Sequence, residues 1–92
     1  MKILCLGEVL IDMLSAGAAD QSEMPAMNLF QPYAGGAPAN VAVAVAKLGG
    51  QGAMVSKVGD DTFGRFLQDM LSYHKVNTDY VWSTKDANTA LA

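Results

Sequence analysis

Four residues of this chain have types and spacing that could bind a polar ligand, and they are Asp12, Gly35, Gly36 and Asn40. Two adjacent glycines allow positive φ angles and the close approach of another group, and a ligand or a hinge needs both properties. The Asn40 amide can both donate and accept a hydrogen bond, which suits a residue that binds the hydroxyl groups of a ligand. Asp12 follows the wholly apolar residues 9–11, where an unpaired charge is costly to bury, and this favours a functional carboxylate over a solvated one.

Asp12 follows a strand at the start of the chain. Residues 2–6 form an apolar run that predicts a central parallel strand, covered on both faces and ending at Gly7. Residues 8–14 keep strand-like content and place Glu8 and Asp12 near the carboxyl end of that strand, where open α/β sheets bind ligands. For Glu8, a solvated or paired carboxylate is an equally good interpretation. Cys5 lies between two leucines, so we interpret it as a packing thiol.

A helix is predicted from about Pro38 to Leu48, directly after the glycine pair. Pro38 presets a φ angle that suits the first turn. Lys47 favours the helix dipole in the last turn, and the glycines at 49–50 supply a left-handed stop. Because alanine and valine occupy nearly every side of this helix, we expect it to be buried. Asn40 then lies in its first turn.

The rest of the chain predicts a βαβ unit followed by a second helix and a third strand. Residues 53–58 predict a strand that closes at Gly59, residues 60–62 offer helix caps, and apolar residues recur at helical spacing over 63–71. This amphipathic helix should cover the sheet, with His74 at its C-terminal turn near the dipole. A short strand over 76–82, a polar turn over 85–88 and an apolar segment over 89–92 follow.

Residues 15–34 are predicted to connect these elements through a loop and a weak strand. Small and polar residues over 15–28 predict a loop or a turn between two short strands, and residues 17–20 within it are interpreted as a surface turn. Residues 28–33 indicate a strand that runs into the glycine pair. Phe30 and Tyr33 could cover a pocket, but core packing is the favoured interpretation.

Composition restricts the classes of function. The chain has 92 residues, of which 51% are hydrophobic and 16% charged, and this apolar character suits a piece that more protein covers. A net charge of −3 without a cluster of Lys or Arg argues against nucleic-acid binding. The apolar run over 41–46 is too short for a bilayer span, and Glu8 and Asp12 interrupt any signal-peptide segment, so we expect a cytoplasmic protein and no membrane partner.

Several familiar motifs do not occur in the sequence. It lacks the glycine fingerprint of NAD-binding proteins, a phosphate loop ending in Gly-Lys-Ser/Thr, a Gly-x-Ser-x-Gly elbow and the ligand spacing of Cys and His in metal sites.

One signature does match. Residues 35–42, followed by Gly49 and Gly59, agree in type and spacing with the first signature of the ribokinase-like sugar kinases, the PfkB carbohydrate kinase family. The resemblance extends to residues 7–12 and 58–64 and so covers nearly the whole chain. Within the family, Gly-Glu-x-Leu-Ile-Asp together with Gly-Gly-Ala-Pro-Ala-Asn-Val-Ala looks most like bacterial fructokinases. Ribokinases usually carry a lysine at the position of Ala37, and this departure argues against ribose.

The resemblance implies an α/β fold, namely the N-terminal part of a ribokinase-like three-layer α/β/α sandwich, with strands of a β-sheet lid over about 13–34 and 89–92. It implies transfer of the γ-phosphoryl group of ATP to a sugar hydroxyl, with Mg²⁺ screening the phosphates. Asp12 and Asn40 would bind sugar hydroxyls, and Gly35 and Gly36 would let the backbone approach the sugar and the lid hinge. The catalytic base and the nucleotide site of the family lie in its C-terminal half, so we expect the 92 residues alone to be inactive.

The sequence alone allows more than one substrate and more than one state of assembly. Fructose is the first expectation and 2-keto-3-deoxygluconate the second, with a homodimer through the lid strands. The alternative is a non-catalytic fragment that acts as an assembly module through exposed lid strands and uncovered apolar faces. An intact mass well above 9.7 kDa would separate the two interpretations by revealing further chain.

Overall fold

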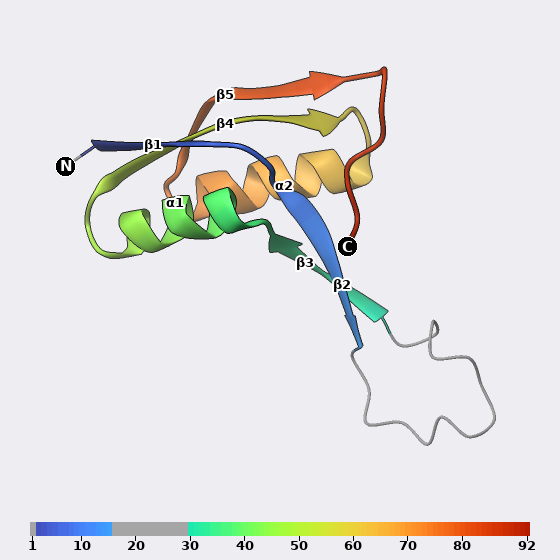
Figure 1. The fold of residues 1–92 in the computed structure, drawn as a ribbon, viewed down its shortest axis with the longest axis horizontal. Helices are drawn as coiled ribbons and strands as arrows, with labels where there is room; N and C mark the ends of the chain where they lie inside the picture. The colour runs from blue at the N-terminus through green and yellow to red at the C-terminus, as the bar shows by residue number, and fades with distance from the viewer. Residues whose placement is uncertain (1, 16–29) are drawn as a thin grey trace.

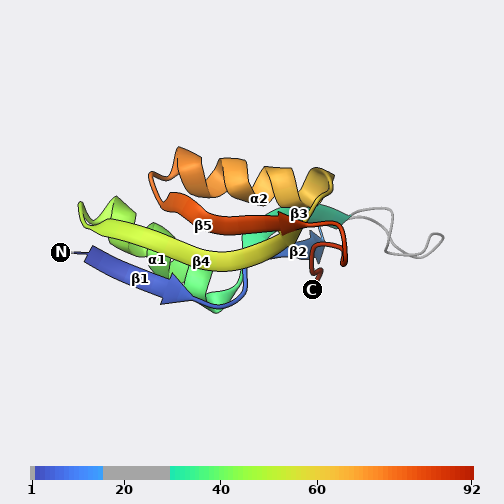
Figure 2. The same cartoon turned by 90° about the horizontal axis from the view of Figure 1, so that it is seen from above.

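The computed structural model describes residues 2–15 and 30–92, and in that part of the chain two helices accompany two separate sheets (Figure 1). The elements in chain order are β1 (Lys2–Leu6), β2 (Leu10–Ser15), β3 (Phe30–Gly35), α1 (Ala37–Lys47), β4 (Gln51–Gly59), α2 (Thr62–Tyr73) and β5 (Asn77–Thr84). Strands β1, β4 and β5 lie side by side in that order as a parallel sheet, as Figure 2 shows. Strands β2 and β3 form an antiparallel pair that projects away from the helices.

Both helices pack on the same face of the parallel sheet (Figure 1). Successive right-handed crossovers that advance in one direction across a sheet place their helices on one side of it. The largest fully buried side chains are Met54 from β4, Leu67 from α2 and Ile11 from β2. The core therefore lies between the helices and one face of the sheet, and it extends to the inner side of β2.

The other face of the parallel sheet is open within the described residues. Leu4 and Leu6 of β1 are 64% and 75% exposed, and Tyr80 and Trp82 of β5 are half exposed on the same side. The prediction that β1 is central and covered on both faces is therefore wrong for these residues, because β1 is an edge strand and both helices lie on the opposite face. Cys5 points to the helices and is buried, as predicted.

Helix α1 confirms the predicted start and end to within one residue, Ala37–Lys47 against 38–48. Gly36 is its N-cap with a φ angle of 101°, and Gly49 follows its end with a φ angle of +88°. The prediction of a helix buried on all sides is wrong here. Val41 is 51% exposed, because only the stripe of Ala39, Ala42 and Val45 faces the sheet.

Helix α2 confirms the predicted amphipathic helix. Asp61 caps it by accepting a hydrogen bond from the Gly64 N–H at 2.7 Å, and Leu67 and Leu71 are buried against the sheet. His74 is the C-cap residue, in agreement with its predicted place in the last turn. Neither helix within the described residues has the length and apolar character needed to cross a membrane.

The β2–β3 pair gains a third, short neighbour from the far end of the chain. The Ile11 N–H donates to the Ala90 carbonyl at 2.9 Å, and the Met13 N–H donates to the Ala92 carbonyl at 2.9 Å. The predicted lid segments therefore lie together in one small sheet, and its role as a lid stays a prediction. The loop expected over 15–28, with its surface turn over 17–20, lies outside the described residues apart from the end of β2.

Candidate functional site

The predicted site residues gather where β2 and β3 meet the N-terminus of α1. Gly36 lies against the connection between β1 and β2. A Cβ placed on Gly36 would lie 2.7 Å from the Glu8 carbonyl oxygen and 3.2 Å from the Val9 Cα. The close approach that this glycine permits is therefore to the chain itself, and it brings the start of α1 against the residues that precede β2. The Glu8 side chain is exposed, which agrees with its solvated interpretation.

Asp12 lies beside Gly35 across the antiparallel pair. In the register of β2 and β3, Asp12 is opposite Tyr33 and Leu10 is opposite Gly35, so Asp12 and Gly35 share one face of the pair. A Cβ on Gly35 would lie 2.8 Å from the Asp12 Cγ. The carboxylate therefore occupies the space that a side chain at position 35 would take, and its position depends on the glycine.

The Asp12 carboxylate is half-buried and has no cationic neighbour in the described part of the chain. The one ion pair there joins Arg65 to Asp60, on the N-terminal turn of α2. A half-buried carboxylate of this kind can accept charge-assisted hydrogen bonds from the hydroxyl groups of a ligand. Such bonds are stronger than neutral ones and fix the orientation of the ligand.

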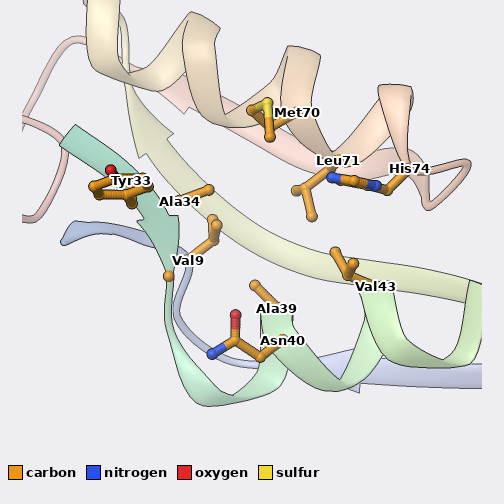
Figure 3. Close-up of a pocket in the computed structure, with 10 residues that line it drawn as sticks. Val9, Tyr33, Ala34, Ala39, Asn40, Val43, Met70, Leu71 and His74 are labelled. Atoms are coloured by element: carbon orange, nitrogen blue, oxygen red, sulfur yellow. The ribbon is translucent and has the colours of Figure 1, made fainter. Parts of the chain in front are cut away.

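Asn40 lies in the first turn of α1, where its N–H donates to the Gly36 carbonyl at 2.9 Å. Its side chain is exposed and borders a hollow of about 200 Å³ between α1, α2 and the end of β3 (Figure 3). Gly35 borders the same hollow, whereas Asp12 and Gly36 do not. The structure thus brings Asn40 and Gly35 to one hollow and Asp12 to Gly35 from the neighbouring strand.

Eight of the ten residues that line this hollow were not among the predicted site residues, and two of these eight, Tyr33 and His74, carry polar groups. Tyr33 borders it and is 44% exposed, so the favoured core interpretation of Tyr33 is wrong. His74 reaches it from the end of α2, next to Leu71 (Figure 3). The spacing of Met70 and His74, four residues apart on one helix face, is the sequence signal that could have indicated this position.

A divalent metal has no evident place among the described residues. No group of three or more His, Cys, Asp or Glu side chains in residues 2–15 and 30–92 lies close enough to hold a metal ion.

Taken together, the site has a carboxylate, an amide and two closely packed glycines at the end of a parallel α/β sheet, beside a small separate sheet. These are features of an α/β protein with a candidate site for a polar ligand. The comparison with known families agrees over the whole chain, because residues 1–92 match the pfkB family of carbohydrate kinases. The chain belongs to this family.

Individual relatives are named fructokinases. The chain is 46% identical over 91 residues to probable fructokinase-7 from Arabidopsis thaliana, a match that covers 98% of this chain and 26% of that protein. The crystal structure of the fructokinase from Xylella fastidiosa with bound ATP is 50% identical, with a TM-score of 0.88, over 99% of this chain and 28% of that one.

A second similar structure holds a sugar. The fructokinase from Vibrio cholerae in its fructose, ADP and calcium ion bound form is 31% identical, with a TM-score of 0.84, over 98% of this chain and 26% of that one. The predicted family and the ribokinase-like α/β fold are thus confirmed. The chain spans about a quarter of the length of the relatives it matches.

Proposed function

We propose that these residues form the sugar-binding part of an ATP-dependent sugar kinase that converts fructose to fructose 6-phosphate. The observation that carries the proposal is the Asp12 carboxylate, held against Gly35 at the entry to α1 and without a cationic partner among residues 2–15 and 30–92. The family match and the fructokinase names of the relatives support the reaction class and the substrate.

Asp12 accepts hydrogen bonds from sugar hydroxyls, and the Asn40 amide pairs with a further hydroxyl at the N-terminus of α1. Phosphoryl transfer depends mainly on positioning and on charge stabilisation, so residues that hold the acceptor sugar in one orientation contribute to the rate. The sheet formed by β2, β3 and residues 90–92 acts as the lid that excludes water. ATP, Mg²⁺ and the catalytic base are bound or supplied outside these 92 residues, which alone are inactive.

The proposal is tested with the full-length protein that carries these residues. Its kcat/KM is measured with MgATP and a panel of acceptors that contains fructose, 2-keto-3-deoxygluconate, ribose and glucose. We expect fructose to give the highest value. A clear preference for 2-keto-3-deoxygluconate would overturn the substrate, and no phosphorylation of any acceptor would overturn the activity.

The assembly is a separate proposal. Within the described residues β3 pairs with β2 alone, and a strand with one free edge can pair with a second copy. We propose a homodimer through the lid strands. Light scattering of the full-length protein should give twice the monomer mass, and a monomer at micromolar concentration would contradict it.

A further inference from the structure

A partly buried cluster of hydrogen bonds joins the start of α2 to the segment that follows β5. Asp61 Oδ1 accepts hydrogen bonds from the Gly64 N–H at 2.7 Å and from the Thr89 hydroxyl at 2.6 Å. Asp61 Oδ2 accepts a third from the Thr89 N–H at 2.9 Å, and the Thr89 hydroxyl oxygen accepts one from the Gly59 N–H at 3.0 Å. We call these four residues the Asp61–Thr89 junction.

The junction is closely packed. Thr89 is 6% exposed and is the one buried polar residue among those described. A Cβ on Gly59 would lie 2.5 Å from the Thr89 nitrogen, and a Cβ on Gly64 would collide with the Gly59 carbonyl oxygen. Hydrogen bonds from the Thr89 hydroxyl, and then from the Thr89 and Gly64 N–H groups, hold the pKa of Asp61 below its ordinary value. The Asp61 carboxylate is therefore ionised at neutral pH, and both of its oxygens accept hydrogen bonds.

The junction lies one residue before the segment that pairs with β2. The Ala90 carbonyl accepts the Ile11 N–H at 2.9 Å, the Ile11 carbonyl accepts the Ala92 N–H at 2.8 Å, and the Ala92 carbonyl accepts the Met13 N–H. These bonds engage β2 on both sides of Asp12. The hydrogen bonds between Thr89 and Asp61 therefore determine the position of residues 90–92. These residues in turn support β2, the strand that carries Asp12.

We propose that Asp61 and Thr89 are positioning residues for sugar binding, which act through residues 90–92 and β2 on the Asp12 carboxylate. Neither residue touches the sugar. The inference rests on the proposed function, since it concerns the affinity of the same site. It differs from a merely structural role in one respect, because it ties these residues to the sugar side of the reaction and leaves the nucleotide side unaffected.

Replacing Thr89 by valine in the full-length protein tests the inference. Valine keeps the shape but removes the hydroxyl that bridges Gly59 and Asp61. We expect the KM for the sugar to rise about tenfold, as for loss of one hydrogen bond to a charged group, while the KM for MgATP stays unchanged. Thr89→Ser keeps the hydroxyl and should restore the sugar KM to within about twofold of the original value. An unchanged sugar KM in Thr89→Val would overturn the proposal.

Asp61→Asn is a second variant in case Thr89→Val does not fold. Its amide oxygen can still cap α2 through the Gly64 N–H, but its NH₂ group faces the Thr89 N–H, where two donors cannot pair. Asp61→Asn should therefore also raise the KM for the sugar. The matched control is Asp60→Asn, one residue earlier. The Asp60 carboxylate pairs with the exposed Arg65, and its loss should leave both KM values unchanged. A rise of equal size in the control would refute the role of the junction.

Amide hydrogen exchange gives a readout that does not need activity. In Thr89→Val, exchange at the Ile11 and Met13 N–H groups should accelerate more than exchange at amides in the middle of β4. Uniform acceleration throughout the protein would indicate general destabilisation and would refute the coupling. If the unmodified protein phosphorylates no sugar, the proposed function fails, whereas the exchange result still decides whether the junction supports β2.

Discussion

Each of the two helices begins beside an aspartate that is packed against a glycine. At α1, the Asp12 carboxylate fills the space next to Gly35, and Gly36 serves as the N-cap without a side-chain hydrogen bond. At α2, Asp61 is itself the N-cap and bonds to the Gly64 N–H. The two helix starts therefore combine the same residue types in two different arrangements.

The difference lies in how far the chain satisfies each carboxylate. Asp61 accepts three hydrogen bonds from its own protein, two of them from Thr89. Asp12 is half-buried beside a glycine and has no cationic partner in the described ranges. A saturated carboxylate holds a fold together, whereas a half-buried carboxylate without a counter-charge is available to a ligand. The following experiments test whether the two aspartates are as different as their surroundings.

The largest effect is expected from Asp12→Ala in the full-length protein. Loss of two charge-assisted hydrogen bonds to sugar hydroxyls should lower kcat/KM for the sugar about a thousandfold. The melting temperature should change little, because the alanine removes a charge that has no cationic partner in the part of the chain that the structure describes. Asp69→Asn, an exposed carboxylate on α2, is the control and should retain full activity. Unchanged kinetics in Asp12→Ala would remove Asp12 from the site.

Gly36→Ala should affect the fold at α1 more than any sugar contact. Its φ angle of 101° and the 2.7 Å approach to the Glu8 carbonyl leave no place for a Cβ. We expect a loss of about 3 kcal/mol in the free energy of unfolding, measured by urea denaturation.

Gly49→Ala is the matched control for this substitution. Gly49 also has a positive φ angle, but a Cβ there would meet nothing within 4 Å. Gly49→Ala should lower the free energy of unfolding only by the cost of a positive φ angle for alanine, about 1 kcal/mol. Equal costs at the two glycines would show that the contact with Glu8 contributes nothing.

The dependence of stability on pH should next test the hydrogen bonds of Asp61. The pKa of Asp61 is lowered in the folded protein, chiefly by the Thr89 hydroxyl. Its contribution to stability is therefore present above the ordinary aspartate value of about 3.9 and is lost as the pH falls through the lower folded value. Asp61→Asn should melt at a lower temperature than the original protein at neutral pH, and this difference should shrink below about pH 4. A constant difference across that range would contradict the assignment.

The smallest effect is expected at Asp60, the neighbour of Asp61. Its carboxylate pairs with Arg65 at 3.4 Å, and both side chains are largely exposed. Exposed ion pairs contribute little because water and salt screen them, so Asp60→Asn should change the free energy of unfolding by less than about 0.5 kcal/mol. A loss as large as that of Asp61→Asn at neutral pH would mean that the charge at the start of α2, rather than the Asp61–Thr89 junction, is responsible.

Much of the secondary structure could be predicted, because local signals specify it. Pro38 and Gly49 mark the start and end of α1 to within one residue, and Asp61 caps α2 as expected. The exposure of individual side chains was less predictable. The apolar residues of β1 and α1 suggested complete burial, yet Leu6 and Val41 are exposed, since hydrophobic composition alone does not say how many neighbouring layers are present.

The residue types and spacing of the chain were sufficient to indicate the family signature, the four candidate site residues and the places where helices begin and end. These features depend on φ preferences, capping and periodicity, which act between near neighbours in the chain. The partner of each carboxylate was not accessible in this way. Asp12 meets Gly35 through strand register, and Asp61 meets Thr89 across 28 positions, so both contacts exist only once the strands and helices have packed. Packing is what leaves Asp12 without a cationic partner among the described residues and gives Asp61 three hydrogen bonds.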